Sequence, residues 1–242
     1  IMAVTFDAAI WAFKNKKLKK PNVLSSSTVF ESDTHFPSRE DHVRQCQPPL
    51  STYGFQKLAC EYYAQGAFEQ YKLPYTIIRP FNCVGVGEKR ALCDSEVSSG
   101  NIKLAMSHVV PDLVQKIVKG QDPLHILGAG NQIRHYTYGG DLARGIRLCI
   151  ESPKAVNEDF NLSTPVSTSV LELAELIWNK IYKGEKPFCY VSDTAFKYDV
   201  QKRVPSVAKA ERLLNFKAET SLDQLLDEVI PWIREQVNIG GI

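Results

Sequence analysis

The sequence predicts an α/β protein built on a parallel, doubly wound sheet, followed by a smaller mixed α/β lobe. Up to about residue 80, helical stretches alternate with short runs of β-branched residues, an order typical of βαβ units. Beyond that point a long glycine-containing loop and more irregular elements indicate a second lobe. The 242 residues, 44% hydrophobic and 23% charged, are enough to bury a substantial core.

The first elements follow from local residue patterns. Apolar residues recur at helical spacing over residues 5–17, which predicts a helix, and the basic residues at its end suit the helix dipole. Asn22–Leu24 then leads into a serine cluster and Val29–Phe30, which we interpret as a short buried strand. Residues 31–50 contain three prolines and mixed charge, so a loop is expected there.

A long helix is predicted after this loop. Ser51 or Thr52 can cap its start, and it runs to about Lys72 before Pro74 ends it. The next residues, 75–79, are rich in β-branched side chains and predict a strand.

The remaining elements are shorter and less regular. After a loop over residues 80–105, we expect strands at 124–127 and 160–162 and helices at about 109–119, 141–151, 170–181, 207–214 and 222–236. The helix at 170–181 has Ser167, Thr168 or Ser169 as its cap, and the last helix is expected to be interrupted at Pro231.

Composition excludes several classes of function. The net charge of +2 gives no reason to expect nucleic acid or an anionic membrane as a partner. The six cysteines include no Cys-x-x-Cys pair, and the five histidines show no ligand spacing. We therefore expect reduced thiols in a cytoplasmic protein and no metal site. No apolar run of the sequence reaches membrane-spanning length.

One pair of residues suggests chemistry. Tyr53 and Lys57 are four apart at the start of the long helix, so they share one helix face. A positive charge held beside a phenol favours the phenolate, which makes the phenol an acid/base for work near neutral pH. The spacing alone is common on solvated helix faces, so its neighbours in the chain have to support the interpretation.

Four segments in order supply that support: Val23–Phe30, Tyr53–Lys57, Ile78–Gly87 and Leu124–Tyr138 with Asp141. In this order the chain resembles the extended short-chain dehydrogenase/reductases, the NAD(P)-dependent nucleotide-sugar epimerases and dehydratases of UDP-glucose 4-epimerase type. Their pattern has a Ser or Thr at a strand end, Tyr-x-x-x-Lys, Arg-x-Phe-Asn and Gly-x-Gly-x-x-x-Arg. The resemblance covers essentially the whole chain and implies a partial Rossmann-like fold.

The resemblance implies roles for the residues around the pair. Tyr53 is expected to be the catalytic acid/base, Lys57 to hold the nicotinamide ribose, and Ser26 to be the catalytic hydroxyl. The cofactor, NAD or NADP, is expected to contact Ser25, Tyr53, Lys57, Pro80 and Phe81. Hydride would leave a sugar carbon for the cofactor while the Tyr53 oxygen takes the proton of the hydroxyl on the same carbon.

The substrate implied is a nucleoside-diphosphate sugar. The positions that match the family's substrate-binding residues are Asn82, His108, Val109, His125, Leu127, Arg134, Asp199 and Arg203. A guanidinium such as that of Arg134 suits a diphosphate. The Arg that the family has just before the late Asp is missing, because Phe196 and Lys197 stand there, and Arg203 is the expected substitute.

Two departures from the family pattern narrow the interpretation. Ser27 and Thr28 stand where dehydratases carry an acidic pair, which favours 4-epimerisation or ketosugar reduction over dehydration or decarboxylation. In addition, the sequence has no Gly-rich dinucleotide fingerprint after a strand. We therefore expect about 90 residues of first βαβ units to be absent from this chain. The chain by itself is expected to bind NAD weakly.

The predicted organisation is residues 1–82 as the C-terminal part of the cofactor-binding domain and residues 83–242 as mainly the substrate lobe, with some segments returning to the first. The preferred function is a nucleotide-sugar epimerase. A ketoreductase or dehydratase of the same family and a non-catalytic nucleotide-sugar-binding relative are the alternatives. The helices at 5–17 and 51–72 carry aromatic residues, and by resemblance we expect them to form a homodimer interface.

Overall fold

The computed structural model describes residues 2–88, 98–99, 102–103, 108–195 and 200–241. The chain divides into two compact units, each built from three separate segments. Unit 1 comprises residues 1–83, 139–166 and 203–219, and unit 2 comprises residues 84–138, 167–202 and 220–242.

Unit 1 is built on a parallel three-stranded sheet in the order β1-β2-β9. Its strands are β1 (Asn22–Leu24), β2 (Thr76–Pro80) and β9 (Glu158–Leu162), and its helices are α1 (Met2–Lys14), α2 (Thr52–Tyr71), α4 (Gly139–Glu151) and α6 (Ala208–Leu214). Short 3-10 helices η1 (Ser27–Phe30), η2 (Glu40–Arg44) and η3 (Pro153–Ala155) complete it. The parallel sheet and the α/β class are those predicted.

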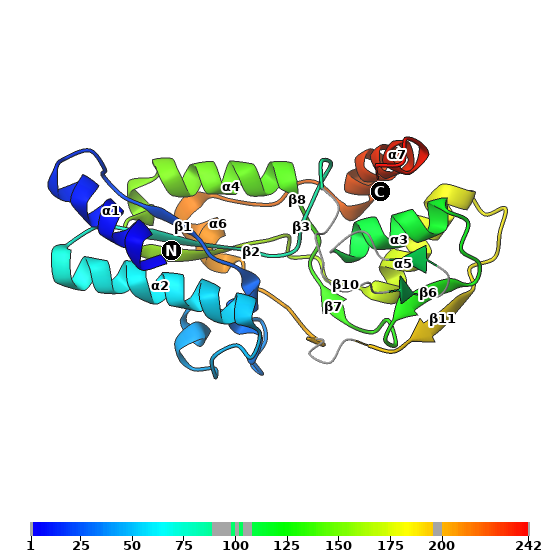
Figure 1. Cartoon of the computed structure of the whole chain (residues 1–242), viewed down its shortest axis with the longest axis horizontal. Helices are drawn as coiled ribbons and strands as arrows, with labels where there is room; N and C mark the ends of the chain where they lie inside the picture. Colours follow the sequence, from blue (N-terminus) through cyan, green and yellow to red (C-terminus); the bar gives the residue numbers. More distant parts are fainter. Residues whose placement is uncertain (1, 89–97, 100–101, 104–107, 196–199, 242) are drawn as a thin grey trace. The chain divides into compact units, whose positions relative to one another are not determined.

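The two faces of this sheet are covered by different helices, with α2 and α4 on opposite sides (Figure 1). Because side chains alternate along a strand, Ile78 and Arg79 point to different faces. Ile78 packs with Phe160 and Leu142 in a core shared with α4 and α6, whereas Arg79 meets Glu61 of α2. Helix α1 packs against α2 through a small apolar cluster around Phe6.

Unit 2 is a mixed α/β unit with a larger apolar core. Its helices are α3 (Val109–Val118), α5 (Val170–Tyr182) and α7 (Leu222–Asn238), and its strands include β6 (Leu124–Leu127), β7 (Ile133–Arg134), β8 (Thr137–Tyr138), β10 (Thr168–Ser169) and β11 (Tyr190–Asp193). Strands β6 and β11 pair in parallel, and β7 and β10 pair antiparallel. The short strands β3 (Cys83–Val84), β4 (Ser98–Ser99) and β5 (Ile102–Lys103) lie in the predicted loop.

Two local predictions were wrong, and strand β11 was not predicted. Val29–Phe30 is buried as predicted but belongs to η1, because the Ser26 side chain caps the next turn and ends the extended backbone. Pro231 does not interrupt α7, since residues on both sides of it, such as Val229 and Ile233, are held in the core of unit 2. Strand β11 was missed because its residues are mostly exposed and give no apolar pattern.

Candidate active site

The end of β1 forms one side of the candidate site. After Leu24 the chain turns at once into η1, and the Ser26 Oγ accepts a hydrogen bond from the Thr28 amide at 3.2 Å. This bond uses a lone pair of the Ser26 hydroxyl and leaves its proton for donation to a ligand. Ser25 is buried, and its hydroxyl donates to the carboxylate of Glu61 on α2.

The start of α2 forms the other side. The Ser51 Oγ caps the helix by accepting from the Gly54 amide at 3.1 Å. Ser51 also donates its amide and its hydroxyl to the Glu31 carboxylate, at 3.2 and 2.5 Å. Because Glu31 directly follows η1, these bonds fix the first turn of α2 against the segment that carries Ser26.

Gly54 lets α2 approach η1 closely. A Cβ atom at this position would lie 2.7 Å from the Pro49 Cβ and 3.0 Å from the Thr28 carbonyl oxygen. The residue before it, Tyr53, is therefore presented on a helix turn that abuts η1. Its side chain is 55% exposed, so its phenol is accessible to a ligand.

Lys57 links Tyr53 to the strand end. Its Nζ donates to the Leu24 carbonyl at 2.9 Å and lies 5.6 Å from the centroid of the Tyr53 ring. An ammonium group has three donors, so two remain for other acceptors. The predicted catalytic residues Ser26, Tyr53 and Lys57 thus come from one strand end and one helix face of unit 1.

Behind this surface lies a buried ionic cluster that the sequence analysis missed. The Arg79 guanidinium binds Glu61 through two hydrogen bonds of 2.8 and 2.7 Å and contacts Asp159 at 2.9 Å. Arg79 and Glu61 are 0 and 1% exposed. Burial would lower the pKa of Arg79, but the two carboxylates raise it above its usual value. Burial alone would raise the pKa of Asp159. The positive charges of Arg79 and Lys209 outweigh this effect and hold the pKa of Asp159 below its usual value.

The Arg-Pro-Phe-Asn segment begins inside the predicted strand and ends beyond it. Arg79 and Pro80 lie within β2 itself, and Arg79 is wholly used in the ionic cluster. Phe81 is 1% exposed and packs with Phe30 in the core, with ring centroids 6.2 Å apart. Its burial gives no support to a contact between this ring and a nicotinamide. Asn82 stands at the end of the segment in the left-handed region, with φ of 35°.

The predicted substrate residues are divided between the units. His125 and Leu127 lie two apart on β6, and the His125 Nδ1 is 2.8 Å from the Asp193 carboxylate on β11. Arg134 lies on β7, paired with Thr168 of β10. These residues belong to unit 2.

Two further predicted residues, His108 and Arg203, stand at segment ends. His108 occupies the position directly before the first residue of α3, Val109, and its Nδ1 lies 2.7 Å from the Glu88 carboxylate. The hydrogen bond to this carboxylate raises the pKa of His108. Arg203 begins the last segment of unit 1, and Asp199 lies outside the described residues.

The residues of unit 1 fit one half of a nicotinamide dinucleotide. The two remaining donors of Lys57 suit ribose hydroxyls, and the carboxyl ends of β1 and β2 form the edge where parallel sheets bind ligands. In the part of the chain that the structure describes, no glycine-rich turn joins a strand of this sheet to a helix, so these residues do not supply a pyrophosphate loop.

Among these same described residues, no cluster of three metal-ligating side chains is present. None of the helices described is long and apolar enough to cross a membrane.

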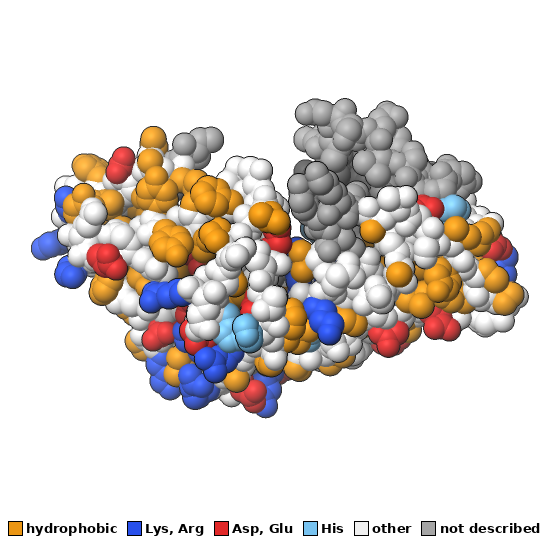
Figure 2. Space-filling view, turned by 90° about the horizontal axis from the view of Figure 1, so that it is seen from below, with side chains coloured by type: hydrophobic (Ala, Val, Ile, Leu, Met, Phe, Trp, Pro, Cys, Tyr) orange, Lys and Arg blue, Asp and Glu red, His pale blue; other side chains and the backbone are white. Residues whose placement is uncertain are grey.

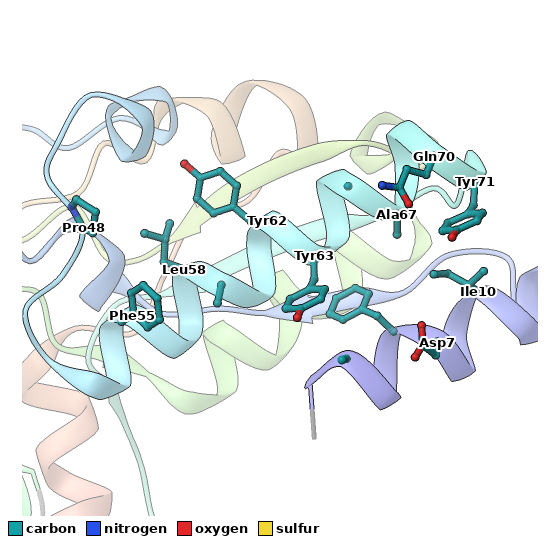
Figure 3. Close-up of a pocket in the computed structure, with 14 residues that line it drawn as sticks. Asp7, Ile10, Pro48, Phe55, Leu58, Tyr62, Tyr63, Ala67, Gln70 and Tyr71 are labelled. Carbon is teal, nitrogen blue, oxygen red and sulfur yellow. The ribbon is translucent and has the colours of Figure 1, made fainter.

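A concave surface runs along α1 and α2. It is a groove of about 580 Å³, lined mainly by aromatic and aliphatic side chains, which include Phe6, Ile10, Phe55, Tyr62, Tyr63 and Tyr71. Figure 3 shows Tyr63 and Ile10 facing this groove from the two helices. The rings of Phe6 and Tyr63 stack with centroids 5.5 Å apart, which holds the helices together at its centre.

Comparisons with known proteins agree with this geometry. Residues 4–163 match the NAD dependent epimerase/dehydratase family. The chain is 26% identical over 231 residues to a UDP-glucuronate 4-epimerase of Thermodesulfobacterium geofontis, covering 93% of this chain and 62% of that protein. It is 26% identical over 215 residues to UDP-glucuronic acid decarboxylase 1 of Arabidopsis thaliana, covering 88% of this chain and 45% of that protein.

Among solved structures, the UDP-glucose 4-epimerase of Thermotoga maritima with UDP-glucose superposes with a TM-score of 0.78 at 25% identity. That match covers 98% of this chain and 69% of the other. The chain therefore has the fold of the corresponding part of such proteins, and it spans less than two thirds of the length of the two curated relatives above.

Proposed function

The chain belongs to the NAD dependent epimerase/dehydratase family, and we propose that it carries the acid/base site and the sugar-binding part of an NAD-dependent nucleotide-sugar 4-epimerase. The observation that carries the proposal is the tether of Lys57 to the end of β1, which sets the exposed Tyr53 beside the turn that bears Ser26. Relatives named as 4-epimerases of UDP-sugars support the substrate class.

Each residue of the triad has a distinct role in the proposal. The Tyr53 phenolate takes the proton of the sugar hydroxyl, becomes the phenol and later returns that proton, and Lys57 supplies the positive charge that favours the phenolate at the start and the end of the cycle. Ser26 donates its hydroxyl proton to the same sugar oxygen, because its lone pair already accepts from Thr28. A bound dinucleotide would supply the acceptor, and then the donor, for the hydride of the sugar carbon. Arg134, His125 and Asn82 remain the proposed contacts to the nucleotide part.

The residues at η1 disfavour dehydration and decarboxylation. Ser27 and Thr28 stand in place of an acidic pair, and both are buried in η1. Neither side chain can act as a carboxylate acid or base. A ketoreductase needs the same three residues as an epimerase. The two activities are therefore distinguished by the product of the reaction.

The test uses the full-length protein that contains this chain, supplied with NAD and with UDP-glucose or UDP-glucuronate. We expect the C4 epimer as the product, and we expect Tyr53→Phe to lower kcat by about 10²- to 10⁴-fold while NAD still binds. Tyr62→Phe is the matched control, because Tyr62 is on the same helix and is 60% exposed. Turnover retained by Tyr53→Phe would refute the assignment, and a 4-keto or reduced sugar as product would identify one of the alternatives.

We also propose that the protein forms a homodimer through α1 and α2. Hydrophobic side chains gather on the surface of unit 1 (Figure 2), and the groove between these helices exposes Phe55, Tyr62 and Tyr63. Exposed aromatic clusters of this kind mark interaction surfaces. Sedimentation should give a dimer for the wild type and for Glu69→Arg, which lies on α2 outside the groove, and a monomer for Ala59→Glu inside it. A dimer that persists in Ala59→Glu contradicts this interface.

A cytoplasmic location completes the proposal. The described cysteines, which are Cys46, Cys60, Cys83, Cys149 and Cys189, are all free thiols, as expected of a protein in a reducing compartment.

A further inference from the structure

We propose that Glu61 is a positioning residue, which through Ser25 and Arg79 fixes where Tyr53 stands relative to Ser26. The inference rests on the proposed function, because Tyr53 and Ser26 need a fixed separation only if both act on one substrate oxygen. Glu61 is 1% exposed, accepts the hydroxyl proton of Ser25 and binds Arg79 through two hydrogen bonds of 2.8 and 2.7 Å. Its carboxylate therefore binds one residue directly after β1 and one residue on β2.

The contacts of α2 form a regular series along one helix face. Tyr53, Lys57 and Glu61 are spaced four apart and so lie above one another. Lys57 binds the carbonyl of Leu24, and Glu61 binds the hydroxyl of Ser25. Two successive turns of the helix thus hold two successive residues of the strand end, and the next residue of the chain is Ser26. The first turn, which carries Tyr53, is held at its start by the bonds of Ser51 to Glu31, and its direction is set by the two turns behind it.

The cluster also binds α2 to the second strand. Arg79 lies on β2, and β1 pairs with β2 in a register that sets Leu24 beside Ile78. Glu61 contacts residues anchored to both strands, so α2 cannot slide or rotate without breaking a buried ionic contact. A slide of one residue would move Tyr53 by about 1.5 Å and turn it by about 100°. Misplacement by about 1 Å is enough to cost a reaction about 10²-fold in rate.

The chemistry of the cluster indicates that holding the fold together is not its only role. A buried ion pair can often be replaced by apolar residues of similar volume with little loss of stability. What an apolar pair cannot supply is the directed bond from the Ser25 hydroxyl and the two-pronged bond from Arg79. The cluster therefore fixes the positions of the site residues. Mutations can then separate its effect on the rate of the reaction from its effect on the stability of the fold.

The test compares two variants of the full-length protein. Glu61→Leu combined with Arg79→Met exchanges the pair for apolar side chains, and Glu61→Gln retains the shape and removes the charge. We expect kcat to fall at least tenfold in both, with the KM for the nucleotide sugar within threefold of the wild type. Asp112→Asn, which breaks another buried pair with Lys116 at 2.8 Å, is the control for lost stability and should keep its kcat.

A readout without turnover separates this inference from the proposed function. With 3-fluorotyrosine at position 53, the wild type should give one sharp ¹⁹F resonance, and both Glu61 variants should give a broadened or divided one. If the wild type turns over no nucleotide sugar, the proposed function fails and the ¹⁹F spectra still decide the positioning role. An unchanged resonance, or a wild-type kcat in the double variant or in Glu61→Gln, would overturn the inference.

Discussion

Gly54→Ala tests how closely α2 approaches η1. In an open helix position, alanine in place of glycine stabilises by about 0.5–1 kcal/mol, because glycine loses more backbone entropy on folding. At position 54 the added Cβ would lie 2.7 Å from the Pro49 Cβ, 2.9 Å from the Ser51 Oγ and 3.0 Å from the Thr28 carbonyl oxygen. Two of these three neighbours are a proline ring and a backbone atom, which have little freedom to move away.

Overpacking of this kind costs about 1–3 kcal/mol. After subtraction of the gain in helix propensity, we expect Gly54→Ala to destabilise the protein by about 1–2 kcal/mol. Gly66→Ala on the same helix is the matched control, since nothing lies within 4 Å of its added Cβ, and it should stabilise by about 0.5–1 kcal/mol. Urea unfolding followed by circular dichroism at one protein concentration measures both. Equal effects of the two substitutions would refute the close approach.

Three further predictions concern the ionic cluster, pH and cofactor binding. Arg79→Met leaves Glu61 buried without its cation and should cost about 3–5 kcal/mol, whereas Lys180→Met, whose two carboxylate partners are mostly exposed, should cost less than about 1 kcal/mol. A similar cost for both would contradict the burial argument. The pKa of His108 is raised in the folded state by Glu88, so its stabilising contribution is complete below pH 6.5 and is lost as pH rises through the folded pKa. The free energy of unfolding of unit 2 should fall over this pH range by less than about 1 kcal/mol, because the ring is exposed. Glu88→Gln should abolish this pH dependence. Calorimetry should show no micromolar binding of NAD to the 242-residue chain alone, because its described residues supply no pyrophosphate loop, and a micromolar affinity would contradict this.

Local sequence signals predicted most of unit 1. Ser51 as a cap and Pro74 after the helix give bounds for α2 that agree with the structure within a residue or two. The β-branched run that became β2 was equally clear. Val29 and Phe30 were misinterpreted because two adjacent buried apolar residues look the same in a strand and in a 3-10 turn, and only the side-chain cap of Ser26 distinguishes them.

The candidate site was predictable only where its residues follow a spacing rule. Tyr53 and Lys57 were found from their separation of four, which places them on one helix face. Glu61 continues that series by another four residues, but the sequence gives no sign that it is buried, because glutamates on helices are usually solvated. Its partners Ser25 and Arg79 are distant in sequence, so their contact depends on the pairing of β1 with β2.

The alternation of the chain between its two units has a consequence for evolution and engineering. Each unit is assembled from three segments, and the backbone passes from one unit to the other five times. A single recombination point therefore cannot exchange one unit for that of a relative, because any cut within the chain leaves at least one unit with segments from both parents. An exchange of unit 2 would require residues 84–138, 167–202 and 220–242 to be transplanted together. Substitutions within a unit do not have this requirement, so they are the simpler way to change one unit without the other.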